Sequence, residues 1–323
     1  MPIIDFHSHF IVPELLDACG RHSVQTGFGI RPFPVAGDPS GKGRIYSQMA
    51  DIGAHIEWMN ASGIDICVIS QSTVLQSTAW ADAAEDLSMC QIANRFAAEF
   101  SNRQPDRFIG SFTLPLQNIE LSLLELKNAK DSLGLKVANF PAKVGGDYVG
   151  DSRFDPVWEA LESTGTPVYI HPHGVTDLWF QKFRMWNSIG QSIEEAKVMT
   201  SLIYEGVLEK FPHLKIVMAH GGGYFPHYLG RLDRNVTNYP ESAKYIRDKP
   251  SAYLKRFYYD SCVYDPTVIE VLVKVVGADR LVMGSDFPVG EPDPVAFLKS
   301  CKAIGKDELP GVLGDTAAHL IGI

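Results

Sequence analysis

The stretch Ile3-Ile4-Asp5-Phe6-His7-Ser8-His9 places two histidines one residue apart, directly after an apolar start. Side chains alternate across a β-strand, so His7 and His9 would project from the same face of the chain. At the end of a buried strand, the two imidazoles would offer their nitrogens to one ion. The stretch therefore predicts a first strand that ends in a pair of candidate metal ligands.

Three later segments share this design, because each runs through apolar residues and stops at a side chain that can bind a metal. They are TPVYIH at 166–171, LKIVMAH at 214–220 and RLVMGSD at 280–286. In a closed parallel barrel, the carboxyl ends of all strands meet at one face. Together the four segments indicate a metal site at that face.

The rest of the chain alternates between short apolar runs and segments with helical spacing. Further strands are expected at 65–70, 108–114, 135–140 and 257–262, and helices at 47–62, 81–100, 118–132, 154–163, 191–210, 266–276, 294–302 and 316–320. Eight strands, each followed by a helix, predict an α/β fold of the (β/α)₈ TIM-barrel type, as one domain over residues 1–323. An open doubly wound sheet would instead place the candidate ligands far apart.

Two long segments follow the first and fifth strands, at 10–45 and 174–190, and we expect them to form long loops. Loops of this length in a compact domain are usually functional, although a flexible excursion is the alternative for the first. The second contains LWFQKFRMW at 178–186. Its aromatic residues would either stack on a substrate ring or bury a contact between two subunits.

Composition excludes several classes of protein. A formal net charge of −9 argues against nucleic acid or an anionic membrane as the main partner. The five cysteines are widely spaced and form no C-x-x-C pair, which indicates reduced thiols and a cytoplasmic location. The chain also lacks an apolar run of the roughly 18 residues that a membrane span requires.

Several motifs resemble those of a known family, nearly over the whole chain and in the same order. They are DFHSH at 5–9, HP at 171–172, AHGGGYFP at 219–226, GR at 230–231, GSDFP at 284–288 and GDTAAHLIG at 314–322. The sequence resembles the metal-dependent amidohydrolase superfamily and, within it, the aminocarboxymuconate-semialdehyde decarboxylase group. This resemblance implies a barrel enzyme with a metal centre.

The resemblance implies His7, His9, His171 and Asp286 as ligands of one divalent cation, typically zinc and sometimes manganese. Three imidazoles and a carboxylate suit zinc. His220 resembles the catalytic histidine of the family, and Asp286 would share its role in delivering a proton. The alternative for His220 is that it is a further ligand.

A second cation is the main alternative for the centre. Amidohydrolases with two cations bridge them through a carbamylated lysine of the fourth strand, where this chain has Lys136. Lys136 lies early in the strand, however, and Asn139 or Phe140 is nearer its carboxyl end. The sequence therefore favours one cation.

Substrate-binding residues are also implied by the resemblance. Arg231 lies 11 residues after His220, at the spacing of an arginine that binds a substrate carboxylate and in some relatives reaches the neighbouring subunit. Arg44 loosely matches a second such arginine. A surface salt bridge is the alternative for both. His173 stands where a decarboxylase of the group carries an aromatic residue, and we expect it to face the substrate.

The implied function is metal-dependent, non-oxidative decarboxylation of an aromatic or muconate-type carboxylic acid by a homodimer. Fold alone does not decide the chemistry. One alternative is a hydrolase or hydratase that uses metal-activated water on a C–N, C–O or C–C bond. Another is a metal-binding barrel without catalytic activity. The expected partner is a small carboxylic acid, with neither nucleic acid nor membrane involved.

Overall fold

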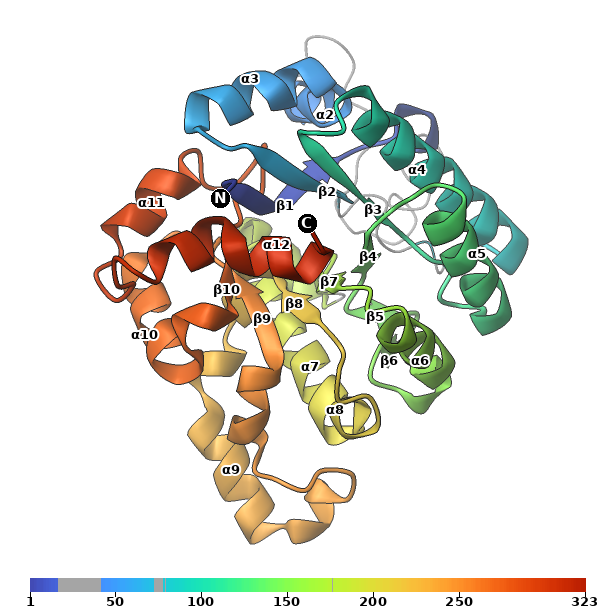
Figure 1. Ribbon diagram of the computed structural model, residues 1–323. Helices are drawn as coiled ribbons and strands as arrows, with labels where there is room; N and C mark the ends of the chain where they lie inside the picture. The colour runs from blue at the N-terminus through green and yellow to red at the C-terminus, as the bar shows by residue number, and fades with distance from the viewer. Residues whose placement is uncertain (17–41, 73–77, 79, 176) are drawn as a thin grey trace.

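The protein forms a parallel barrel surrounded by helices, seen in a computed structural model that describes residues 1–16, 42–72, 78, 80–175 and 177–323 (Figure 1). Its main sheet has eight strands, whose spatial order follows the order of the chain. The strands are β1 (Ile4–Phe10), β2 (Ile66–Gln71), β3 (Phe108–Phe112), β4 (Val137–Phe140), β7 (Val168–Ile170), β8 (Ile216–Met218), β9 (Phe257–Asp260) and β10 (Leu281–Val282).

Backbone hydrogen bonds join the first strand to the segment that follows the last strand. The amide nitrogen of Phe6 donates to the carbonyl oxygen of Met283 at 2.8 Å, and that of Asp286 donates to the carbonyl oxygen of His7 at 2.7 Å. These contacts close the sheet. The predicted (β/α)₈ barrel is therefore confirmed, and the open doubly wound sheet is excluded.

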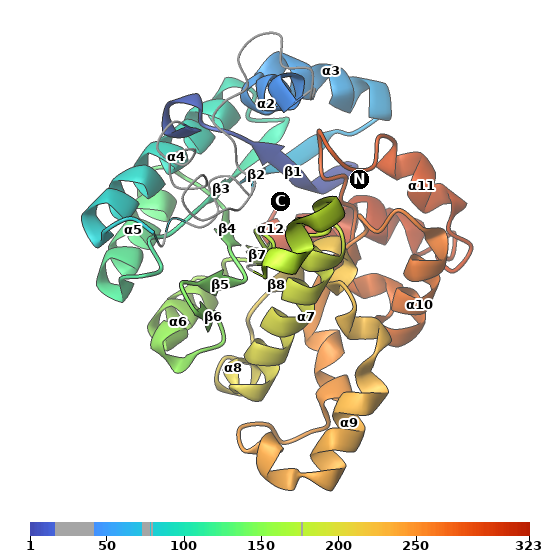
Figure 2. The same cartoon turned by 180° about the vertical axis from the view of Figure 1, so that it is seen from behind.

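Helices enclose the barrel on its outside (Figures 1 and 2). They are α2 (Lys42–Ala50), α3 (Ile52–Ser62), α4 (Ala83–Arg103), α5 (Ile119–Asp131), α6 (Asp155–Ser163), α7 (Ile189–Tyr204), α8 (Val207–Lys210), α9 (Leu229–Asn238), α10 (Pro266–Val276), α11 (Pro294–Ser300) and α12 (Thr316–Ile321). The side chains of α12 pack against Ile4 and Phe6, which lie inside the barrel. They form one apolar cluster with Val68, Val137 and Val217. The helix thus closes the amino-terminal end and leaves the carboxyl ends of the strands for the site.

The structure corrects some element boundaries. The helix predicted at 47–62 is two helices, because Asp51 caps the second of them by accepting a hydrogen bond from the amide of Gly53. The helix predicted at 191–210 is interrupted at Gly206, whose φ of 78° is left-handed. A short hairpin of β5 (Lys143–Val144) and β6 (Asp147–Tyr148), which the sequence analysis did not predict, follows β4.

The two predicted loops differ in how much of them the structure describes. Most of the segment 10–45 lies outside the described residues, and α2 begins at Lys42. The segment 174–190 contains a kinked 3₁₀ helix, η2 (Leu178–Arg184). Within the described residues, no helix is long and apolar enough to cross a membrane. The four cysteines in this part of the chain, Cys67, Cys90, Cys262 and Cys301, are free thiols.

Candidate metal centre and active site

The four predicted metal ligands lie together at the carboxyl ends of the strands. His7 and His9 belong to β1, His171 follows β7 and Asp286 follows β10, and one ligand atom of each lies within 4.8 Å of the others. The Nε2 atoms of His7 and His9 are 3.1 Å apart. The Oδ1 atom of Asp286 lies 3.3 Å from the first of them and 3.0 Å from the second.

A register shift in β1 helps to assemble this cluster. The pairing of β1 with β2 is irregular between Asp5 and Ser8. As a result, Phe6 and His7 both contact the ring of Tyr169 inside the barrel, at centroid distances of 5.9 and 5.3 Å. From His7 onward the chain alternates, so His9 faces the interior as the period of two predicted.

Hydrogen bonds on the far side of the rings set which nitrogens carry lone pairs. His9 Nδ1 lies 3.2 Å from the carbonyl oxygen of Gln71, which can only accept, so Nδ1 carries the proton and Nε2 the lone pair. His7 Nδ1 lies 2.7 Å from Asp260, whose carboxylate also accepts from the Tyr169 hydroxyl at 3.0 Å. The two Nε2 lone pairs and a carboxylate oxygen then converge, which fits a bound cation.

The electrostatics of the cluster favour a positive charge at its centre. Burial lowers the pKa of His7, but the carboxylates of Asp286 and Asp260 outweigh this effect and raise it to about 9, so without a cation Nε2 carries a proton that a bound cation would replace. Burial lowers the pKa of both His9 and His171, which keeps their nitrogens free to bind a cation. Despite its burial, Asp286 has a pKa well below its ordinary value, because of His7 and His220.

His220 lies at the edge of the cluster, in the 3₁₀ segment η3 (Ala219–Gly222) after β8. Its ring centroid is 4.9 Å from that of His171, and its Nε2 atom is 3.9 Å from Oδ2 of Asp286. Its Nδ1 atom hydrogen-bonds to Glu195 of α7, a fully buried carboxylate. The hydrogen bond to Glu195 turns the Nε2 atom of His220 toward the centre. The geometry suits an acid or base beside the ligands rather than a fifth ligand.

A glycine makes room for the Glu195 carboxylate. Gly223 has a φ of 60°, and a Cβ atom on it would lie 2.6 Å from Glu195 Oε2 and 2.5 Å from the carbonyl oxygen of Ser192. Any larger residue at this position would therefore push α7 away from His220.

Comparison with known proteins places this site in a family. The family described as "Amidohydrolase" matches residues 4–323. The chain belongs to this family.

Several similar proteins are named as decarboxylases. The 2-amino-3-carboxymuconate-6-semialdehyde decarboxylase of Dictyostelium discoideum is 31% identical over 284 residues, which cover 86% of this chain and 79% of that protein. The structure of 5-carboxyvanillate decarboxylase from Sphingomonas paucimobilis has a TM-score of 0.89 and 25% identity to this chain. The match covers 100% of this chain and 99% of that chain. Another similar structure is a 5-carboxyvanillate decarboxylase from Novosphingobium aromaticivorans DSM 12444, in complex with manganese and 4-hydroxy-3-methoxy-5-nitrobenzoic acid. Its TM-score is 0.88 and its identity 25%, and the match covers 100% of this chain and 96% of that chain.

Lys136, the candidate for a lysine that bridges two cations, does not point into the barrel. Val137 packs in the interior cluster, so its neighbour Lys136 alternates to the outside. The next inward position toward the carboxyl end of β4 is Asn139, which is buried and cannot be carbamylated. This arrangement supports a single cation, as the sequence analysis favoured.

The predicted substrate residues differ in their burial. His173 follows His171, and its Nδ1 atom is buried without a hydrogen-bond partner among the described residues. Burial, aided by the charge of Lys143, lowers the pKa of His173 to about 4, so the ring is neutral. Arg44 of α2 and Arg231 of α9 are exposed. The helix α9, which carries Arg231, extends from the barrel at its periphery (Figures 1 and 2).

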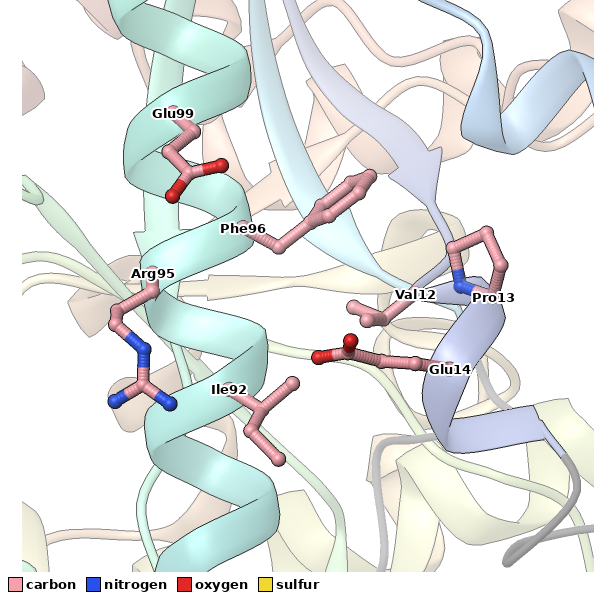
Figure 3. Close-up of a pocket in the computed structure, with 7 residues that line it drawn as sticks. All are labelled: Val12, Pro13, Glu14, Ile92, Arg95, Phe96 and Glu99. Carbon is pink, nitrogen blue, oxygen red and sulfur yellow. The ribbon is translucent and has the colours of Figure 1, made fainter.

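A separate hollow lies outside the barrel, between the end of β1 and α4 (Figure 3). Its volume is about 400 Å³, and its walls are Val12, Pro13, Glu14, Ile92, Arg95, Phe96 and Glu99. None of these residues belongs to the metal cluster, so we do not assign the hollow to the active site.

Four further residues surround the centre and were not among the predicted site residues: Tyr169, Glu195, Asp260 and Tyr264. Asp260 ends the apolar strand β9, which is the same design that identified the ligands, and that pattern could have revealed it. Glu195 lies on the buried face of a long helix, beside a second glutamate and outside any motif. Only the packing of α7 against η3 shows that it reaches His220.

Proposed function

We propose that the protein is a metal-dependent, non-oxidative decarboxylase of an aromatic or muconate-type carboxylic acid. One observation carries the proposal: a cluster of three imidazoles and one carboxylate has a separate histidine, His220, beside it. The named relatives support decarboxylation as the reaction. His7, His9, His171 and Asp286 would hold the cation.

Decarboxylation requires an electron sink and then a proton. Loss of carbon dioxide leaves a pair of electrons on carbon, and a divalent cation supplies a Lewis acid that polarises an adjacent oxygen. The chain supplies the proton. Burial alone would lower the pKa of His220, but the carboxylates of Glu195 and Asp286 raise it well above its usual value. This raised pKa favours the protonated imidazole, and we propose His220 as the general acid.

The choice of cation follows from the donor set. Three imidazole nitrogens and one carboxylate oxygen suit zinc, which we propose as the native ion. Manganese is the alternative, because it is bound in the similar 5-carboxyvanillate decarboxylase. Elemental analysis of the purified protein distinguishes the two.

We assign substrate recognition to His173, Arg44 and Arg231. An arginine binds a carboxylate through two parallel hydrogen bonds. Since Arg231 is exposed on α9, we propose that it acts at the site of a neighbouring subunit in a homodimer. The exposed Trp179 and Phe183 of η2, at 53% and 90% exposure, offer an apolar contact for such a dimer. The charge of −9 and the free thiols support a cytoplasmic location.

An assay of carbon dioxide release tests the proposal. Substrates are 2,6-dihydroxybenzoate, 5-carboxyvanillate and muconate-type acids, with product analysis that also detects hydrolysis and hydration. We expect release of carbon dioxide that stops on chelation and returns with zinc or manganese. If the metal-loaded protein hydrolysed or hydrated its substrates without losing carbon dioxide, the alternative chemistry of the superfamily would replace the proposal.

A further inference from the structure

The two carboxylate oxygens of Asp286 face different groups. Oδ1 faces the ligand nitrogens, at 3.3 Å from His7 and 3.0 Å from His9. Oδ2 faces away from them, at 3.9 Å from Nε2 of His220. The Tyr264 hydroxyl donates a hydrogen bond to the same Oδ2 atom at 3.4 Å. One oxygen is thus turned to the cation position and the other to the proposed acid.

Tyr264 is held in a conformation that its own packing does not explain. It follows β9 and has a φ of 59°, which is rare for an aromatic residue and strained. Its side chain is 58% exposed, so burial of the ring contributes little to holding it there. Burial of the hydroxyl and the nearby Cys262 and Asp286 raise the pKa of Tyr264, so the hydroxyl keeps its proton and donates it. The hydroxyl contacts both the Cys262 thiol and Oδ2 of Asp286 in this conformation.

Gly290 supports the same arrangement from the other side. A Cβ atom at Gly290 would lie 2.5 Å from the Cβ atom of Asp286 and 3.1 Å from the Tyr264 hydroxyl. Its amide donates to the carbonyl oxygen of Asp286 at 2.9 Å. The turn after Asp286 is therefore packed closely around the aspartate and the tyrosine hydroxyl.

We infer that Tyr264 is a positioning residue that holds Oδ2 of Asp286 on the side of His220 and leaves Oδ1 on the side of the cation position. The catalytic part of this inference rests on the proposed function. The structural part concerns only how Asp286 binds a cation. Without the hydroxyl, the second oxygen is free to turn toward the cation. A carboxylate that binds through both oxygens no longer offers one to His220.

The test compares the variant Tyr264→Phe, which removes only the hydroxyl, with Tyr239→Phe, which makes the same change on an exposed tyrosine of the α9 region. Each protein is loaded with Co²⁺, whose visible absorption weakens as its coordination number rises. We expect weaker absorption in Tyr264→Phe, and the wild-type spectrum in Tyr239→Phe. On whichever of 2,6-dihydroxybenzoate and 5-carboxyvanillate the wild type decarboxylates, kcat of Tyr264→Phe should fall about tenfold with KM little changed.

The two readouts separate this inference from the proposed function. If the wild type decarboxylates neither acid, the function is in doubt, and the Co²⁺ spectra still decide the role of Tyr264. An unchanged Co²⁺ spectrum in a folded Tyr264→Phe protein overturns the inference. A kcat within twofold of the wild type overturns its catalytic part.

Discussion

The hydrogen bonds behind His7 and His9 determine what the centre binds. Each ring gives its Nδ1 proton to an acceptor, Asp260 or the Gln71 carbonyl, and turns its Nε2 lone pair inward. His220 differs, because its Nδ1 is held by Glu195 and its Nε2 lies 3.9 Å from an oxygen that faces away from the other ligands. The candidate ligands and the proposed acid therefore differ in what lies behind each ring.

This distinction predicts different effects on metal content. His9→Ala and Asp286→Ala should lose the cation, because each removes one of four converging donors. His220→Asn should retain it, while kcat falls by about 10² to 10⁴, the usual contribution of a positioned proton donor. Elemental analysis and steady-state kinetics on the same samples check both statements. Loss of the cation from His220→Asn would make His220 a ligand.

Glu195 should act only through His220. Glu195→Gln keeps the shape of the side chain but removes the charge that holds His220 protonated, so kcat should fall about 10- to 100-fold with KM unchanged. In the double variant with His220→Asn, the loss should equal that of His220→Asn alone. Additive losses in the double variant would show that Glu195 has an independent role.

At the scale of elements, α7 packs closely against η3 and against Gly223, the residue that follows η3. Gly223→Ala would place a methyl group 2.6 Å from Glu195 Oε2, in a backbone with a φ of 60°. Gly63→Ala is the control for a positive φ alone, since its φ is 69° but nothing lies within 4 Å of the added carbon. Gly63 has left-handed backbone, where alanine costs about 1–2 kcal/mol. Gly223 has a ψ of −133°, a backbone region that strongly favours glycine, so its substitution costs more.

We expect Gly223→Ala alone to lose catalytic activity, and to unfold at a lower temperature than Gly63→Ala. Differential scanning calorimetry and the decarboxylase assay measure the two effects. Equal unfolding temperatures and full activity in both variants would show that α7 can move without harm to His220.

Local sequence patterns predicted the strands and their ligands, because alternation and a polar terminal residue are properties of a few adjacent residues. The same patterns placed Asn139, not Lys136, near the carboxyl end of its strand. They could not predict the break at Asp51, where a cap overrides a continuous apolar period. Nor could they find Glu195 or Tyr264, whose roles depend on contacts between residues distant in the sequence.

At the scale of the whole molecule, Arg231 links the site to the oligomeric state. It is exposed on α9, and we propose that it serves the partner's site. Mixing two inactive variants tests this directly. If the arginine acts across the interface, a dimer with one His220→Asn chain and one Arg231→Ala chain has one complete site. Random mixing makes about half of the dimers mixed, so it should recover roughly a quarter of the wild-type activity.

Each variant measured alone is the control for this mixture, and sedimentation should show a dimer at micromolar concentration. No recovery of activity in a mixture that forms mixed dimers would place Arg231 at the site of its own chain or outside catalysis. If sedimentation showed only a monomer, the proposed dimer interface would be excluded.

The most direct test of the proposed reaction is decarboxylation in heavy water by the metal-loaded protein. Because the proton from His220 exchanges with solvent, the product should carry one deuterium at the carbon that lost its carboxylate, as mass spectrometry and NMR would show. A product formed without deuterium at that carbon would contradict decarboxylation with proton delivery at this site.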